Sequence, residues 1–324
     1  MDERYFQAKQ RAVLREHFDA NETMFLEREL TQLRAKMYEV QFPELRARNF
    51  APKASDISPS AETFSYKVLE PVGRAKFISY KAGDLPRVDV IAREVLGKVR
   101  PLGASFGWDL NELRRAAELN TPLPEVKARI ARETVERQID EVLAFGGMLD
   151  DTGNRPAVGL DGIVNNADVV AQGIVSGSYW FGGAVAGPAL LAELASDVSN
   201  IATNSHQVFR ANTLLLPVRH FNYIAQTPYG TFTGDSILKY LLENNPGLDV
   251  QPWYQLDAAG AAGKPRGIVY QKDPSILESV IPQEFETLPP RWVGLEALND
   301  CHARCGGVKV YQPLAMKYVD FLTS

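Results

Sequence analysis

Cysteine and histidine are scarce in this chain of 324 residues, which has two of the first and four of the second. The two cysteines, Cys301 and Cys305, cannot form the set of disulfides that staples small secreted proteins. We therefore expect a protein that folds without disulfide bonds, in a reducing compartment. Its length and its 45% content of hydrophobic residues are sufficient for two sizeable cores.

Long hydrophobic runs are also missing from the sequence. The richest stretch, Val169–Leu194, is interrupted by five glycines and a proline, and no 18 apolar residues follow one another. The first twenty residues are crowded with charge and lack the apolar centre of a signal peptide. These patterns predict neither a membrane-spanning helix nor an export signal.

No basic stripe is present either. The net charge is −5, the isoelectric point is about 5.6, and lysines and arginines alternate with acids along the chain. A protein that reads DNA sequence usually carries a clustered basic footprint. If this protein meets DNA, we expect it to enclose the nucleic acid without specific contacts.

One motif suggests an enzyme. Gly103-Ala-Ser105-Phe-Gly107 fits the G-x-S-x-G pattern of a hydrolase nucleophile elbow, between an extended run and a helical one. Such an elbow requires a preceding parallel sheet, whereas the upstream residues favour helices and a long hairpin. A serine hydrolase using Ser105 is kept as an alternative, and the main expectation is a protein that is not an enzyme.

Metal and cofactor motifs are incomplete. Cys301-His-Ala-Arg-Cys305 offers three ligand types in one segment without a second cluster, which falls short of a tetrahedral zinc site. Gly260-Ala-Ala-Gly-Lys264 resembles a phosphate loop, but its glycine spacing is short and Pro265 occupies the position of the metal-binding hydroxyl. We therefore predict no metal and no cofactor.

Hydrophobic periodicity predicts several elements. The longest helix is expected over Pro124–Phe145, with prolines at its start, Gly146-Gly147 at its end and an apolar face that includes Ile130 and Val135. Further helices are expected over residues 22–36, 188–203 and 235–243, a buried strand over residues 212–217, and a closing strand within residues 306–321.

Two extended segments precede the long helix. Residues rich in β-formers occur at 63–66, 76–81 and 95–106, and the charged stretch 84–94 separates them. Paired across that stretch, they would form a hairpin reaching about 45 Å at about 3.3 Å per residue. An isolated two-stranded ribbon is marginal in water, so it needs another surface to cover it.

Six segments in order resemble the major capsid proteins of tailed double-stranded DNA bacteriophages: Thr23–Leu30, Asp84–Val90, Gly103–Leu113, Gly159–Asn166, Leu238–Pro246 and Cys301–Val308. The resemblance covers about residues 23–320. It implies an α+β chain with the Hong Kong 97-type capsid fold. Encapsulin shells share that fold, and an encapsulin-type compartment shell is kept as an alternative.

The resemblance implies a division of the chain into an N-terminal arm (1–61), an extended β-hairpin loop (62–106), a peripheral domain with a spine helix (107–158 and 274–324, spine 124–145) and an axial domain (159–273). It also implies a location in the virion after assembly in the host cytoplasm. The implied partners are other copies of the chain in hexamers and pentamers, portal, scaffolding and cement proteins, and packaged DNA.

Charged residues on the loop and the spine are candidates for contacts between subunits: Arg74, Lys76, Arg87, Asp89, Arg93, Glu133 and Arg137. Each could equally be solvated, because exposed ion pairs contribute only about 0 to 1 kcal/mol. We align no lysine, asparagine and glutamate for an isopeptide crosslink, so none is predicted. A built-in scaffold before the first matching segment is not expected either.

Overall fold

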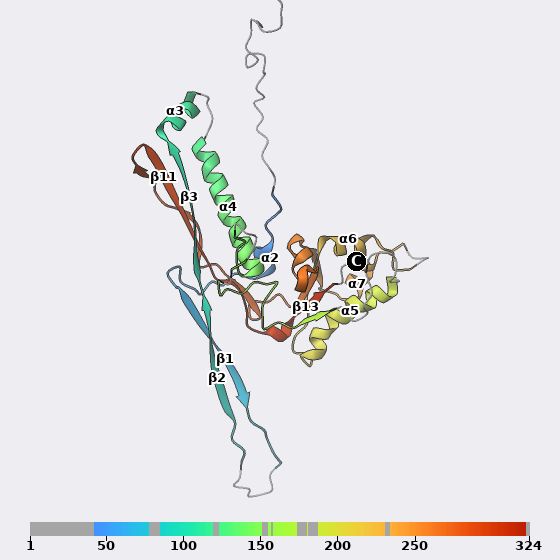
Figure 1. Ribbon diagram of the computed structural model, residues 1–324. Helices are drawn as coiled ribbons and strands as arrows, with labels where there is room; N and C mark the ends of the chain where they lie inside the picture. Colours follow the sequence, from blue (N-terminus) through green and yellow to red (C-terminus); the bar gives the residue numbers. More distant parts are fainter. Residues whose placement is uncertain are drawn as a thin grey trace, which may run out of the picture. The chain divides into compact units, whose positions relative to one another are not determined.

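The computed structural model describes residues 42–77, 85–118, 123–150, 155–156, 158–173, 180, 187–230 and 234–321 (Figure 1). The chain divides into two compact units, Met1–Glu44 and Leu45–Ser324, and every element below belongs to the second. The helix expected over residues 22–36 lies outside the described residues.

The first two strands form a hairpin. β1 (Thr63–Val72) and β2 (Asp89–Lys98) pair antiparallel over ten rows, from Thr63 opposite Lys98 to Val72 opposite Asp89. The charged stretch expected to separate the strands contributes the first half of β2 instead. Charge is compatible with this strand because residues 89–94 are all exposed.

The next strand leaves the hairpin and joins a second sheet. β3 (Arg100–Asp109) pairs antiparallel with β11 (Glu296–Cys305), whose other edge carries β9 (Gln283–Thr287) and β10 (Arg291–Val293). The expectation that residues 62–106 form one hairpin is therefore wrong beyond Lys98. The change of sheet occurs at Val99, which is buried and whose amide donates to the carbonyl of Glu62 at 2.8 Å, closing the hairpin at its base.

The long helix is present as predicted. α3 (Leu110–Glu118) follows β3, and α4 (Leu123–Phe145) runs along the sheet of β3 and β11 (Figure 1). The buried face of α4 carries Ala131, Val135, Ile139, Val142 and Leu143. Ile130, expected on this face, is 52% exposed, whereas the adjacent Ala131 is buried.

A loop caps the end of α4. The last four carbonyls of a helix have no partner within the helix. Here the carbonyls of Leu143 and Ala144 accept from the amides of Ile163 and Val164 at 2.9 and 3.0 Å, and the side chain of Asn165 donates to the carbonyl of Phe145 at 2.7 Å. Gly146 takes a positive φ of 69° and donates to the carbonyl of Val142, which completes the cap.

A mixed five-stranded sheet forms the second half of the unit, in the order β4-β13-β7-β5-β6. Its strands are β4 (Ala171–Gly173), β5 (Thr213–Leu216), β6 (Asp249–Pro252), β7 (Arg266–Tyr270) and β13 (Met316–Asp320). The division implied by the family resemblance places the closing strand in the peripheral domain, with the rest of residues 274–324. Instead, β13 pairs with β7 and β4, inside the sheet built by residues 159–273.

Both faces of this sheet are covered, which explains why β5 and β7 are buried at every position. Leu215, Ile268 and Tyr318 join one core, together with the buried face of α4. Leu214 and Val269 project to the other face of the sheet. They belong to a second core with the helices α5 (Gly187–Asn204), α6 (Val218–Gln226) and α7 (Ile237–Asn244). The first core thus spans the expected boundary between the peripheral segment 107–158 and the axial domain 159–273.

Two further helices and a buried strand agree with the predicted periodicity. α5 (Gly187–Asn204) and α7 (Ile237–Asn244) confirm two expected helices, and α6 (Val218–Gln226) follows the expected buried strand, β5. Shorter elements complete the unit: α2 (Ala47–Phe50), β8 (Leu277–Val280), β12 (Gly307–Val310), η1 (Tyr254–Ala258), η2 (Ala261–Gly263) and η3 (Pro313–Ala315). β8 and β12 pair as a small separate sheet.

Candidate assembly surface

Among the described residues, the β1–β2 hairpin leaves much of its surface uncovered by this chain. Opposite residues of an antiparallel pair project to the same face. One face, which we call the inner face, carries Phe64, Tyr66 and Val68. The other, the outer face, carries apolar and charged positions that are exposed throughout: Lys67, Leu69, Pro71, Val90, Ala92, Glu94 and Leu96.

The base of the inner face is anchored to the rest of the unit. The ring of Phe64 lies over Gly97, where an added Cβ would lie only 2.2 Å from it. Phe64 also packs on a small core of Ala54, Val99 and Val280. These contacts fix where the hairpin leaves the unit.

A second anchor is aromatic. Tyr66 meets Tyr311 edge to face with ring centroids 4.8 Å apart, and the hydroxyl of Tyr311 donates to Glu278 Oε2 at 2.9 Å. Burial raises the pKa of Tyr66 above its ordinary value, so its hydroxyl stays neutral at physiological pH. Beyond Val68 the strands no longer bury side chains.

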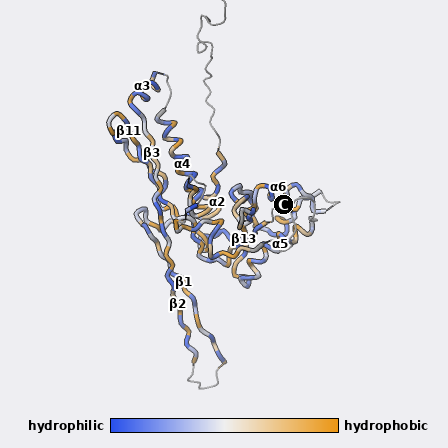
Figure 2. Tube along the Cα trace, in the orientation of Figure 1, coloured by the Kyte–Doolittle hydropathy of each residue, from blue (hydrophilic) through white to orange (hydrophobic). Residues whose placement is uncertain are grey.

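The outer face carries large apolar side chains in contact with water. Leu69 is 63% exposed and Leu96 70%, and Phe77 beyond the end of β1 is fully exposed. Apolar positions recur along both strands (Figure 2). Contiguous exposed apolar surface commonly marks an interaction site.

The seven charged residues named as candidates for contacts between subunits lie on two parts of the structure, the hairpin and the helix α4. Arg74, Lys76 and Arg87 lie beyond the paired rows, at the far end of the hairpin, and Asp89 and Arg93 lie on β2; all five are exposed. Asp89 accepts a hydrogen bond from the adjacent amide of Val90 at 2.8 Å.

The two spine candidates pair with each other. Arg137 Nη2 lies 3.3 Å from Glu133 Oε1, one helical turn apart on α4, with both side chains partly exposed. An exposed pair of this kind adds a few tenths of a kcal/mol to the helix. Its geometry leaves the side chains at a surface where another copy could reach them.

A second exposed apolar surface was not predicted from the sequence. β10 and β11 are joined by a tight turn at Gly294, with a positive φ of 65°, and Trp292, Val293 and Leu295 around it are all more than half exposed. The Trp-Val-Gly-Leu sequence was the available signal, since a glycine turn between β-formers is typical of a hairpin. Nothing in the sequence indicated that its side chains stay uncovered.

The geometry around Ser105 differs from a nucleophile elbow. Ser105 lies in the middle of β3, opposite Asp300 on β11, and the helix begins only at Leu110. His302 lies on the same face, one step along β11. Asp300 pairs with Arg291 at 3.2 Å, and within the described part of the chain neither Ser105 nor His302 makes a side-chain hydrogen bond.

Strand geometry separates the ligand candidates of the Cys301–Cys305 segment. The two thiols are four positions apart on β11, about 13 Å at about 3.3 Å per residue, and His302 projects to the opposite face. Both thiols are buried. Over the residues that the structure describes, no group of three potential ligands could hold a metal ion, and no helix is long and apolar enough to span a membrane.

Solved structures similar to this chain include capsids. The capsid of Myoviridae phage XM1 aligns with a TM-score of 0.80 at 18% identity, over 93% of this chain and 100% of the other. A structure from Mycobacterium phage Ogopogo aligns at 0.62 with 12% identity, over 90% and 96%. The capsid of a native GTA particle aligns at 0.59 with 12% identity, over 94% and 98%.

The family described as "Major capsid protein" matches residues 73–322. The chain belongs to the major capsid protein family. No curated protein matches it. As a major capsid protein it is a structural subunit of a virion shell, and its α+β architecture is the Hong Kong 97-type fold that the six sequence segments indicated.

Proposed function

We propose that this major capsid protein closes into the icosahedral head of a tailed bacteriophage, around double-stranded DNA that it encloses without sequence-specific contacts, and that the β1–β2 hairpin holds neighbouring copies together. The single observation that carries the role of the hairpin is its uncovered outer face. Ten rows of paired backbone leave Leu69, Val90 and Leu96 in water. A ribbon of this kind needs a partner surface to be stable.

Shell formation gives the hairpin that partner. Closed shells repeat one heterologous contact many times, so a contact that is weak by itself becomes strong in the assembly. Arg74, Lys76, Arg87, Asp89 and Arg93 would then form ion pairs with a neighbour at the margin of the apolar contact, and Glu133 and Arg137 would do so on the spine. Each such pair contributes about 0 to 1 kcal/mol.

The domain division is proposed with two changes. The extended loop comprises residues 62–98, since β3 belongs to the β3–β11 sheet. The axial domain comprises residues 159–273 together with β13. The arm (1–61), the spine in α4 and the rest of the peripheral domain keep their expected places. Portal, scaffolding and cement proteins are the proposed partners besides other copies, and the host cytoplasm is the proposed place of assembly.

We also infer that the subunit has no catalytic activity of its own. Ser105 lies on a flat antiparallel strand, without the sharp turn that exposes a nucleophile. The carboxylate of Asp300 is held by Arg291, so it does not orient His302 as a general base would require. An active-site fluorophosphonate probe should leave Ser105 unlabelled in the folded protein, and labelling of Ser105 would contradict the inference.

A pair of charged substitutions tests the hairpin. Leu69→Asp with Leu96→Asp places two acids on the outer face without touching any buried residue. We expect the subunit to keep its circular dichroism and its unfolding midpoint, since exposed substitutions change stability by about 0.5 kcal/mol or less. Electron microscopy should show that the closed particles formed by the unaltered protein are lost.

Val208→Asp is the matched control, because Val208 is as exposed as Leu96 but lies after α5, away from the hairpin. Particles of normal size from the double variant would refute the role of the hairpin. The contents of the particles separate the encapsulin-type alternative: nuclease-protected DNA supports a phage head, and a packaged enzyme supports a compartment shell.

A further inference from the structure

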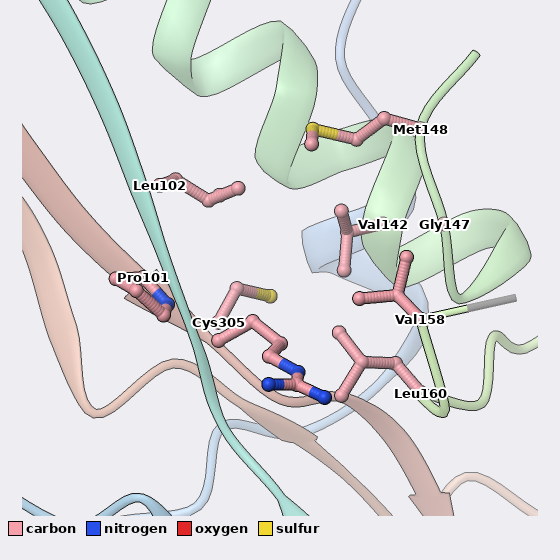
Figure 3. Close-up of a pocket in the computed structure, with 9 residues that line it drawn as sticks. Pro101, Leu102, Val142, Gly147, Met148, Val158, Leu160 and Cys305 are labelled. Atoms are coloured by element: carbon pink, nitrogen blue, oxygen red, sulfur yellow. The ribbon is translucent and has the colours of Figure 1, made fainter. Parts of the chain in front are cut away.

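An apolar pocket opens where β3 leaves the base of the hairpin. Its volume is about 220 Å³, and its walls come from β3, the end of α4, the loop that follows α4 and the end of β11. Figure 3 shows the side chains of Leu102, Val142, Met148, Val158, Leu160 and Cys305 around a common space. Arg100 and Pro101 also line it.

The lining is chemically suited to an aromatic ring. Leu102, Val142 and Cys305 are buried, and burial raises the pKa of the Cys305 thiol to about 11, so the sulfur is uncharged. An apolar cavity of about 150 Å³ lined by aliphatic side chains stays dry and accepts a benzene ring. The sulfur atoms of Met148 and Cys305 add favourable contacts with an aromatic edge, and Arg100 adds a cation near its face.

Phe77 carries an aromatic side chain of a size that suits this pocket. It is fully exposed and lies just beyond the far end of the paired rows, after Val72. Transfer of a fully exposed phenylalanine ring from water into an apolar pocket is favourable, because it removes a large apolar area from water.

The pocket cannot take Phe77 of its own chain. The pocket begins at Arg100, two residues after the base of the hairpin at Lys98, whereas Phe77 follows the opposite end. Ten paired rows separate the two, which is about 30 Å at about 3.3 Å per residue. A Phe77 ring that enters the pocket must therefore come from another copy of the chain.

We propose that Phe77 of a neighbouring copy inserts its ring into the pocket formed by Leu102, Val142, Met148, Val158, Leu160 and Cys305. This rests on the proposed contact of the hairpin with neighbouring copies and names where its tip docks. The same chain carries both halves of the contact at opposite ends of the hairpin. Each copy can therefore fill one neighbour's pocket while a different neighbour fills its own, as the heterologous contacts of a ring require.

Photo-crosslinking in assembled particles tests the contact directly. p-Azidophenylalanine in place of Phe77 retains a single ring and is activated by light, and mass spectrometry then locates the attached peptide. We expect adducts between copies on the peptides that contain Leu102, Met148 or Val158. The same photo-reactive residue in place of Trp292, which is also exposed, should not label these peptides.

Two outcomes would count against the proposal in different ways. Particles whose residue 77 attaches only to other peptides would overturn the docking site while leaving the shell function intact. If the unaltered chain forms no particles under any assembly condition, the proposed function fails with it.

Substitution of Phe77 gives a second measurement that does not depend on crosslinking. Phe77→Asp should raise the protein concentration needed for assembly at least about tenfold, whereas Phe77→Leu should retain most of the assembly, because a leucine side chain also fills an apolar pocket. Neither change should alter the unfolding midpoint of the subunit. Equal assembly of the two variants would contradict the proposal.

Discussion

Gln255 Nε2 donates a hydrogen bond to Asp140 Oδ2 at 2.9 Å, at a partly buried junction between η1 and the spine helix α4. Asp140 is 1% exposed, and its other oxygen accepts from the amide of Ala47 at 2.7 Å. One side chain of the spine helix α4 thus holds α2 and η1 in place. Burial raises the pKa of Asp140 above its ordinary value, against the opposing effect of these two hydrogen bonds.

The first prediction compares two substitutions of Asp140. Asp140→Asn keeps an acceptor for Ala47, and its amide can donate to Gln255 Oε1 once the Gln255 amide turns over; that oxygen is buried without a partner among the described residues. We expect its free energy of unfolding to stay within about 1 kcal/mol of the unaltered protein. Asp140→Ala leaves the amide of Ala47 without its acceptor and should lose about 1 to 3 kcal/mol. Urea unfolding of the unassembled subunit measures both, and equal losses would contradict the prediction.

The second prediction concerns acid. His220 is buried against Phe321 and Trp180, and burial lowers its pKa to about 4. In the unfolded chain its pKa is about 6.5, so between these values the unfolded state binds the extra proton. Stability is therefore lost as pH falls from about 6.5 to about 4, by at most about 3 kcal/mol from this group.

Substitution isolates that contribution. His220→Phe keeps an aromatic ring in the stack and should flatten the pH dependence of the unfolding free energy across this window. His206→Asn is the control, because His206 is exposed and asparagine tolerates its positive φ of 51°. If His220→Phe retains the full acid sensitivity, another group is responsible.

The third prediction separates a buried ion pair from an exposed one. Arg266 binds Asp320 through two hydrogen bonds of 2.6 and 2.9 Å, and it also donates to the carbonyl of Val164 at 2.8 Å. Asp320→Asn leaves the buried guanidinium without its counter-charge and should cost about 3 to 5 kcal/mol. Asp235→Asn removes the acid of an exposed pair with Lys239 and should cost at most about 1 kcal/mol. Similar losses would show that burial does not decide the difference.

The fourth prediction concerns the base of the hairpin. Gly97→Ala puts a methyl group into the ring of Phe64, so the ring must leave its place over β2. We expect a loss of about 1 to 3 kcal/mol from this local overpacking. Hydrogen exchange of the amide of Val99, which closes the hairpin, should become faster. Unchanged exchange would mean that Phe64 does not fix the base.

Local structure could be predicted from the sequence where one hydrophobic pattern, helical or extended, dominates a segment. The helix of residues 123–145 has prolines at its start and glycines at its end, so its bounds follow from capping rules. The buried strand at residues 213–216 could be expected because a run of leucines bounded by a proline leaves little choice. The exposed Ile130 shows the limit, since an apolar face broader than the surface it meets leaves one edge in water.

Pairing between distant segments could not be predicted in the same way. Residues 95–106 have one uniform β-forming composition, yet the chain changes sheets at Val99, because the partner of β3 lies almost two hundred residues further on. The candidate surface was located only as a region for the same reason. Charged residues on the hairpin could be named from the sequence, but the exposed Leu69, Leu96 and Phe77 became visible only once the pairing showed which face is uncovered.

The position of β13 in its sheet also sets an order of events in the cell. Chains are synthesised from the N-terminus, and β13 is the last of its five strands to be made, although it lies between β4 and β7. Until residues 316–320 emerge, β7 exposes an unpaired edge, and the hydroxyl of Tyr318 cannot donate to the carbonyl of Ile163 beside the end of the spine helix. Both cores include residues of this last strand or of its end, so neither is complete until well after the hairpin strands have been synthesised.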